Sequence, residues 1–279
     1  MSMKNHNGAI PDKVDFKDYR FEFVAGSTPI PNKFSLKDKI VAIKHQGKSS
    51  SCVGQAFSYY AEVLNFIETG KKVKLSARDI YSTIHLENGG AYLRDGAKKL
   101  TDSGVLLERD ATSYIDGKLP TEAFMRQRND ITEAEIEKGN DFLAKSYIKV
   151  PVNFESIKRA IYENNGCVIG LFGTNEGWET ELVTPPVEWK WGHAVYLCGY
   201  DENYIEFVNS WGEGWGNVSF GKFGKEYMRL AFTPWTVQDM SNDYYQNLKR
   251  KKSLLLKLKV LYKQLLELIG LLNKLMKIA

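Results

Sequence analysis

A cysteine at the expected start of a helix is the first candidate for acyl chemistry. Cys52 lies in the stretch KHQGKSSSCVGQAFSYY, where apolar spacing predicts a helix over residues 51–69. Free N–H groups and the helix dipole at such a terminus favour the thiolate, the nucleophilic form of cysteine. The alternative is that Cys52 packs as a small apolar residue, as free cysteines usually do. Cys167 and Cys198 lie in apolar runs and are assigned to the core.

His193 is the best candidate for a base that would activate this thiol. It belongs to a predicted β-hairpin, WGHAVYLCGYDENYIEFVNSWG. A turn centred on Asp201 would place His193 opposite Asn209, and a one-residue slip would place Asn209 beside Ala194, still within reach. Two apolar pairs would then lie beneath, Val195 with Phe207 and Leu197 with Ile205. Asn209 could orient the imidazole through one nitrogen and leave the other nitrogen for Cys52.

Two further side chains have spacings that suit this site. Gln46 precedes Cys52 by six residues, and its amide could donate to the oxyanion of a tetrahedral intermediate together with the Cys52 N–H group. His45 adjoins Gln46, and because neighbouring side chains on extended backbone point in opposite directions, at most one of the two faces the site. Trp211 could shield the hydrogen bond of His193 from water, or could simply pack in the core.

The surrounding elements predict an α+β protein with a helical half followed by a sheet half. Helices are expected over 51–69, over 77–87 with Ser76 as N-cap, over 92–103, over 130–146 and over 154–164. The runs CVIGLFG, HAVYLCGY and YIEFVNSWG then read as strands. We expect the site at the seam between the two halves.

Taken together, these motifs resemble those of the papain-like cysteine peptidases. The stretches that carry the resemblance are QGKSSSC with AFS, HAVYLCGY and NSWGEGWG, within about residues 33 to 230. The resemblance implies a two-lobe fold, with a helical lobe and an antiparallel β-sheet or barrel lobe. It implies catalytic roles for Cys52, His193, Asn209 and Gln46. Gly89 and Gly90, in ENGGAYLRDGAKKL, match a loop that pairs with the substrate backbone, and Trp211 and Trp215 are added as substrate-binding residues.

The sequence departs from the family pattern at several positions. The half-cystines of a common family disulfide are replaced by Ser49 and Glu87, which fits a reducing compartment or a bacterial or phage branch of the family. Val53 stands where an aromatic residue is usual. Only about 33 residues precede the matching region, so we expect no long inhibitory propeptide and no control by zymogen cleavage.

The function implied is that of a cysteine endopeptidase acting on peptides or proteins. Two alternatives stay open: a cell-wall peptide amidase or acyl transferase with the same triad, and a binding protein whose active site is retired. The cysteines form no C-x-x-C pair and the histidines are scattered, so we expect neither a metal nor another cofactor. The overall composition, 43% hydrophobic and 26% charged residues, is typical of a globular protein.

Charge divides the chain into a mildly acidic body and a basic C-terminal helix. The net charge is +4, yet residues 249–279 alone carry nine Lys or Arg and one acidic residue. Leucines there repeat with 4,3 spacing, as in a coiled-coil seam: Leu254, Leu258, Leu261, Leu265, Leu268, Leu272 and Leu275. We expect self-association or docking, binding to an anionic membrane surface, or a spacer. Nucleic acid is not an expected partner.

The expected organisation is a lead-in (1–33), a papain-like domain (34–240) and the basic amphipathic helix (249–279). The N-terminus lacks the apolar core of a signal peptide. No run of about 18 apolar residues is present to cross a membrane. We therefore expect a cytoplasmic protein, with peripheral membrane association as an option.

Overall fold

The computed structural model describes residues 8–15, Asp18, residues 29–240, and residues 258, 261, 262, 264–266 and 269. The chain divides into two compact units, residues 1–241 and residues 242–279. Most of the predicted basic helix lies outside the described residues. Among the residues described, no helix has the length and apolar character needed to span a membrane.

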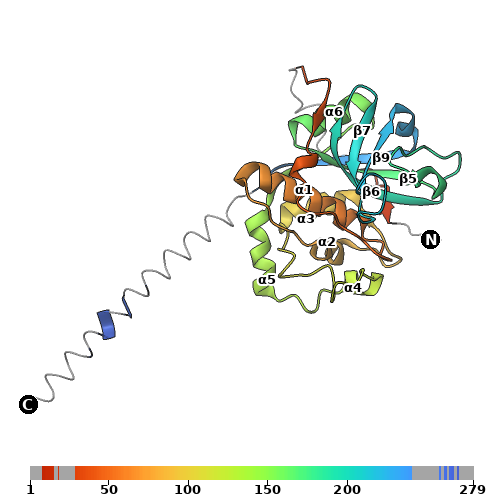
Figure 1. The fold of residues 1–279 in the computed structure, drawn as a ribbon. Coiled ribbons are helices and arrows are strands. Elements are labelled where there is room, and N and C mark those ends of the chain that lie inside the picture. The colour runs from red at the N-terminus through yellow and green to blue at the C-terminus, as the bar shows by residue number, and fades with distance from the viewer. Residues whose placement is uncertain are drawn as a thin grey trace, which may run out of the picture. The chain divides into compact units, whose positions relative to one another are not determined.

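Helices form one half of the first unit, as predicted. Figure 1 shows α2 to α5 on one side of α1 and strands β5 to β9 on the other. We call residues 52–138 the helical half. Its helices are α1 (Cys52–Thr69), α2 (Ala77–Ile84), α3 (Leu93–Asp102), α4 (Glu122–Arg126) and α5 (Glu133–Lys138), while α6 (Phe154–Glu163) packs on the sheet. Short 3₁₀ helices are η2 (Lys37–Lys39), η3 (Gly139–Phe142), η4 (Glu176–Trp178) and η5 (Lys225–Leu230).

A seven-stranded sheet forms the other half, and six of its strands lie in residues 144–240, which we call the sheet half. Its pairings are antiparallel, in the order β4-β9-β5-β6-β7-β8, and β2 also pairs with β6. The strands are β2 (Phe34–Ser35), β4 (Ala144–Lys149), β5 (Cys167–Gly173), β6 (Trp191–Tyr200), β7 (Tyr204–Val208), β8 (Phe220–Gly224) and β9 (Ala231–Met240). A separate parallel pair joins β1 (Ala9–Ile10) to β3 (Ala91–Tyr92).

Helix boundaries follow the predicted signals where a cap is present. Gly70 ends α1 in the left-handed conformation (φ 68°), which glycine adopts without steric cost. The Ser76 side chain accepts a hydrogen bond from the Asp79 N–H group and caps α2. This helix ends at Ile84, three residues earlier than predicted.

The predicted charged helix over 130–146 is present only as the shorter α5, and its predicted C-terminal part is wrong. A capping box of Thr132 and Glu135 starts α5, but the helix ends at Lys138. The chain then passes through η3 and leaves as strand β4, which pairs with β9 at the sheet edge. At this turn a β-carbon on Gly104 would lie 1.9 Å from the Gly139 carbonyl oxygen. Close backbone packing and strand pairing therefore override the helical pattern.

The hairpin is present, but its predicted register is wrong. Leu197 pairs with Phe207, not with Ile205, and Tyr200 pairs with Ile205. The register shifts between Leu197 and Gly199, where one extra residue is inserted into β6. At Leu197 the offset from the predicted register is two residues, an even number, so Leu197 and Phe207 keep their predicted face.

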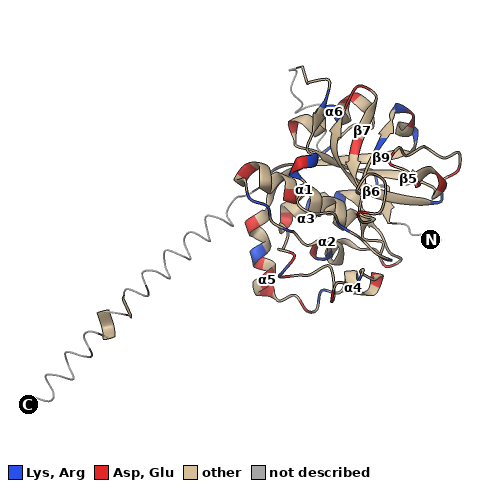
Figure 2. Ribbon diagram, viewed as in Figure 1, with Lys and Arg blue, Asp and Glu red and all other residues tan. Residues whose placement is uncertain are grey.

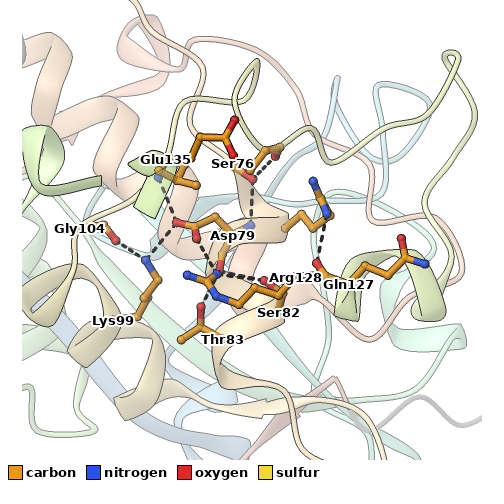
Figure 3. A network of polar contacts seen from close by, with 12 residues as sticks. Ser76, Asp79, Ser82, Thr83, Lys99, Gly104, Gln127, Arg128 and Glu135 are labelled. Atoms are coloured by element: carbon orange, nitrogen blue, oxygen red, sulfur yellow. Dashed lines mark hydrogen bonds and ion pairs between the residues drawn. The ribbon is translucent and has the colours of Figure 1, made fainter. Parts of the chain in front are cut away.

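A buried ion-pair network anchors α2 within the helical half. The Asp79 carboxylate accepts hydrogen bonds from Lys99 Nζ (3.0 Å) and Arg128 Nη1 (2.8 Å), as Figure 3 shows. It also accepts from the Leu106 N–H group (3.0 Å). Burial raises the pKa of Asp79, but these positive charges and hydrogen bonds outweigh it, and the pKa lies below its ordinary value.

Charge is distributed differently in the two halves. In Figure 2, acidic and basic residues mark α5 and many loops, whereas the ribbons of β5 and β6 are uncharged. Both strands are buried almost throughout, so their sequences read as continuous apolar runs. Cys167 and Cys198 lie in these strands with no exposed surface, which confirms their assignment to the core.

Candidate active site

Cys52 is the first residue of α1 and is fully buried. The sulfur lies within reach of the backbone N–H groups of Val53 and Ala194. Ala194 belongs to β6 and follows His193 directly. The N-terminus of α1 therefore meets the middle of the sheet half at this point, as expected for a site at the seam.

The side chains of His193 and Asn209 form the predicted hydrogen bond. His193 Nε2 lies 2.8 Å from Asn209 Oδ1, which also accepts from the Ser210 N–H group at 2.8 Å. Because this oxygen only accepts, Nε2 carries the hydrogen and Nδ1 is the unprotonated nitrogen of the neutral ring. A ring in this tautomer can take a proton through Nδ1.

The same helix that carries Cys52 also holds Asn209 in place. Tyr59, two turns along α1, donates its hydroxyl to the Asn209 carbonyl at 3.1 Å, and Ser219 Oγ donates to it at 2.8 Å. Asn209 is fully buried. The cysteine and the asparagine are thus positioned by one rigid element, although they are far apart in the sequence.

Aromatic rings surround His193. The Trp211 ring lies 4.8 Å from the imidazole and the Trp178 ring 5.5 Å from it, centroid to centroid. Burial lowers the pKa of His193 to about 4, and the Asn209 hydrogen bond offsets only part of this effect. Trp211 lies where the shielding role requires. Trp178 was missed, because it comes from a loop (η4) without periodicity, and only its residue type could have drawn attention to it.

Gln46 reaches the site, but part of its amide is engaged. Its Oε1 accepts from Ser210 Oγ at 2.7 Å, and its Nε2 donates to the Ser49 carbonyl at 2.9 Å. An amide nitrogen has two hydrogens, so one remains for a substrate oxygen. The neighbouring His45 turns away, and its Nδ1 accepts from the Gly47 N–H group at 3.0 Å.

Residues 8–12, which we call the covering segment, begin beside the sulfur at Gly8. A β-carbon on Gly8 would be only 2.6 Å from Cys52 Sγ, so the backbone approaches this closely because residue 8 is glycine. The Gly8 N–H group donates to the Gly192 carbonyl (3.1 Å), and the Gly8 carbonyl accepts from the Ala91 N–H group (3.1 Å). This contact was not predicted, since the segment is short and has no periodic pattern.

Polar contacts fasten the far end of the covering segment. Asp12 accepts from the Arg94 N–H group at 3.0 Å and from Trp235 Nε1 at 2.6 Å. Arg94 in turn donates to the Lys13 carbonyl at 2.7 Å and pairs with Asp18 at 2.6 Å. The segment is therefore held by both halves, since Arg94 belongs to α3 and Trp235 to β9.

Burial under this segment changes the expected chemistry of Cys52. It raises the pKa of the thiol to about 12, and the N–H groups of Ala194, Val53 and Cys52 lower it only partly. The prediction that the helix terminus favours a thiolate therefore fails for the covered state, because loss of water outweighs the dipole. Both Cys52 and His193 are neutral in this arrangement near pH 7.

The predicted substrate-binding residues lie around this site, and they differ in the hydrogen bonds that they already make. Gly89 and Gly90 are buried with φ of 88° and 74°. The Gly90 N–H group donates to Tyr81 Oη at 3.0 Å, and the N–H group facing the covering segment is that of Ala91. Trp215 is half-buried and donates its Nε1 to the Trp178 carbonyl at 2.7 Å.

Comparison with known proteins agrees with this geometry. A family model described as papain family cysteine protease matches residues 30–231. Chymomexicain from Jacaratia mexicana is 26% identical over 207 residues, covering 69% of this chain and 87% of that protein. Against several other curated relatives, the chain spans a little over half of their length.

Solved structures share the fold. Xylellain, a cysteine protease from Xylella fastidiosa, superposes with a TM-score of 0.73 at 22% identity, covering 85% of this chain and 97% of that one. A Carica candamarcensis cysteine protease in complex with E-64 gives 0.60 at 17% identity, with 75% and 99% covered. The predicted helical and antiparallel sheet lobes are confirmed, and neither the amidase nor the retired-site alternative is favoured. This chain belongs to the papain family of cysteine proteases and is a cysteine-type peptidase.

Proposed function

We propose that Cys52 is the nucleophile and that His193 is its base. In this mechanism the thiol proton passes to His193 Nδ1, the sulfur attacks the peptide carbonyl, and the imidazolium protonates the leaving amine. Water then hydrolyses the thioester and returns the thiol. The single observation that carries the proposal is the Asn209 hydrogen bond, which occupies Nε2 and leaves Nδ1 to exchange protons.

Different groups are assigned to the oxyanion and to the peptide substrate. The Cys52 N–H group and the remaining Gln46 Nε2 hydrogen would donate to the tetrahedral intermediate. The backbone around Gly89 and Gly90 would pair with the peptide, a role supported by the Ala91 hydrogen bond to Gly8. Trp211 and Trp215 would shield the His193 side of the site.

A peptide can reach the sulfur only when the covering segment leaves. Gly8 occupies the space next to Cys52 Sγ, and its two backbone hydrogen bonds use Gly192 and Ala91. Its departure would readmit water, which stabilises a thiolate and an imidazolium. We therefore assign the ion pair to the open state.

A thiol-reactive epoxide tests these assignments. E-64, found with one of the structural relatives, should label Cys52 of the full chain. Cys52→Ala should remove the label and the hydrolysis of a fluorogenic peptide, while Cys167→Ala should retain both. Peptide hydrolysis by the Cys52→Ala variant, or equal labelling at Cys167, would contradict the proposal.

The C-terminal helix is proposed to associate with a second copy of itself. Leu258, Leu261 and Leu265 belong to the predicted seam, and they are helical and 54–59% exposed. A Leu258→Glu/Leu265→Glu variant should lower the mass measured by light scattering and leave peptide hydrolysis unchanged. Loss of liposome flotation with no change in mass would favour the membrane surface instead.

The proposed compartment is the cytoplasm, and the proposed substrates are peptides or proteins. All three cysteines are free in the structure, which suits a reducing environment. Cell fractionation with an antibody tests the compartment. The masses of the products from one digested protein would define the preferred cleavage sites.

A further inference from the structure

Two loops that flank Cys52 are held together without a covalent link. Residues 46–51 lead into α1, and residues 85–90 end beside the covering segment. All three cysteines of the chain are free, so no disulfide joins the loops. The side chains between them must provide whatever fixes their spacing.

Glu122, the first residue of α4, contacts the cysteine-bearing loop directly. Its Oε2 accepts from the Ser50 N–H group at 2.6 Å, two residues before Cys52. Its Oε1 accepts from Tyr81 Oη and from Arg126 Nε, each at 2.7 Å. One half-buried carboxylate therefore receives three donors from three different elements.

The two partners of Oε1 extend to the second loop. Tyr81 Oη accepts from the Gly90 N–H group at 3.0 Å, and Arg126 Nη1 donates to the Glu87 carbonyl at 2.9 Å. The loops also pack closely, because a β-carbon on Gly89 would lie 3.3 Å from Ser50 Oγ. We call Glu122, Tyr81 and Arg126 the carboxylate clamp.

Glu122 of the clamp is ionised, and the helix that carries Tyr81 is firmly anchored. Burial raises the pKa of Glu122, but the donors from Ser50, Tyr81 and Arg126 bring it below its ordinary value. Hydrogen bonds to a charged acceptor are stronger than neutral ones. Tyr81 lies on α2, which the Asp79 network of Figure 3 anchors two residues earlier.

We propose that Glu122 is a positioning residue, which sets the spacing between the nucleophile loop and the backbone that receives the peptide. It touches neither Cys52 nor the substrate and acts through Ser50 and Gly90. The proposal rests on the proposed function, in which the chain around Gly90 binds substrate. Failure of this proposal can be told apart from failure of the proposed function, because loss of the clamp changes the spacing of the two loops and leaves Cys52 and His193 in place.

Hydrogen exchange at two amides is the direct test. In Glu122→Ala, exchange at the Ser50 amide should accelerate, because its acceptor is removed. Exchange at Gly90, which Glu122 does not contact, should also accelerate by about tenfold, because the tie through Tyr81 is lost. In Tyr81→Phe only the Gly90 amide should respond.

Steady-state kinetics supply a second readout. They are measured in the full chain carrying Gly8→Val, so that the covering segment does not compete with substrate. With a fluorogenic peptide, Glu122→Ala should raise KM about tenfold and change kcat by less than about threefold. Glu122→Gln retains one oxygen acceptor and should restore part of the lost affinity.

Glu135→Ala is the matched control. Glu135 also lies in the first turn of a short helix, and it accepts hydrogen bonds from the N–H and hydroxyl groups of Thr132. It should leave both amides and KM unchanged. Unchanged exchange at Gly90 in Glu122→Ala, or an equal response in Glu135→Ala, would overturn the clamp. Loss of hydrolysis in Cys52→Ala would still support the proposed function.

Discussion

In the helical half buried charges face one another, whereas in the sheet half the histidine lies among aromatic rings. Asp79 is fully buried between Lys99 and Arg128, and Glu62 is buried against Lys44. Around His193 the neighbours are Trp178, Trp191 and Trp211. Charge pairs fix the geometry of loops and helices, and aromatic rings exclude water from an imidazole. The two halves therefore contribute different things to one site.

The largest expected effect is the loss of stability when the buried charge network of the helical half is disrupted. Asp79→Ala leaves the buried Lys99 and the half-buried Arg128 without their shared carboxylate, which should lower the free energy of unfolding by about 3–5 kcal/mol. Chemical denaturation measures this loss. Asp102→Ala, which removes an exposed pair with Lys98, is the control and should change stability by less than about 0.5 kcal/mol. Similar losses in both variants would contradict the role of the buried network.

The two halves should lose their contributions to stability in different pH ranges. The pKa of His193 is lowered to about 4, while unfolded histidine titrates near 6.5, so the unfolded state takes up the proton first. Stability from the neutral ring is fully present above pH 6.5 and should fall by about 3 kcal/mol as pH drops to 4. The Asp79 contribution, with its lowered pKa, is lost only below about pH 3.8.

Denaturation at several pH values checks these windows. His193→Asn should flatten the stability curve between pH 6.5 and 4 and leave the steeper fall at lower pH. A variant that keeps the full slope in the upper window would show that another group carries it.

Asn209→Ala tests the hydrogen bond that His193 makes among the aromatic rings of the sheet half. The imidazole loses the acceptor that fixes its tautomer, so kcat should fall about a hundredfold. The free energy of unfolding should fall by about 1–3 kcal/mol, because a buried ring nitrogen is left without a partner. The measurement is peptide hydrolysis beside thermal unfolding. A variant with unchanged kcat would remove Asn209 from the site.

Gly8→Val is expected to have the smallest of these effects, acting where the two halves meet. A β-carbon at residue 8 has no room beside Cys52 Sγ, so the covering segment should be displaced. Loss of its one or two backbone hydrogen bonds should speed alkylation of Cys52 about tenfold. Val14→Ala, at a side chain 79% exposed, is the control. Equal rates for Gly8→Val and the unaltered chain would mean that the segment does not restrict access.

Sequence reasoning succeeded where local chemistry decides the structure. The Gly70 and Ser76 caps and the uncharged strand around Cys198 follow from residue type alone. The hairpin register could not be predicted, because the extra residue near Cys198 has no distinctive side chain. The carboxylate clamp was also missed, since Glu122 looks like any first-turn acid until tertiary contacts bring Tyr81 to it.

The covering segment was the largest surprise in the site. A lead-in over residues 1–33 was expected, but its contact with the sulfur was not. A lone Gly8 has many structural uses, and only the closeness of Gly192 and Ala91 reveals this one. The raised pKa of Cys52 follows from burial of the thiol, to which Gly8 contributes, and so it could not be predicted from the helix terminus.

The burial of Cys167 and Cys198 makes the remaining thiol a built-in gauge. Burial raises the pKa of both far above the ordinary range, so a mild colorimetric thiol reagent should find neither in folded protein. Any thiol that reacts in the folded protein then belongs to Cys52, which is itself buried until the covering segment leaves. The rate of that reaction, compared with the rate for a small free thiol, therefore measures how often the segment opens, without any substrate being known.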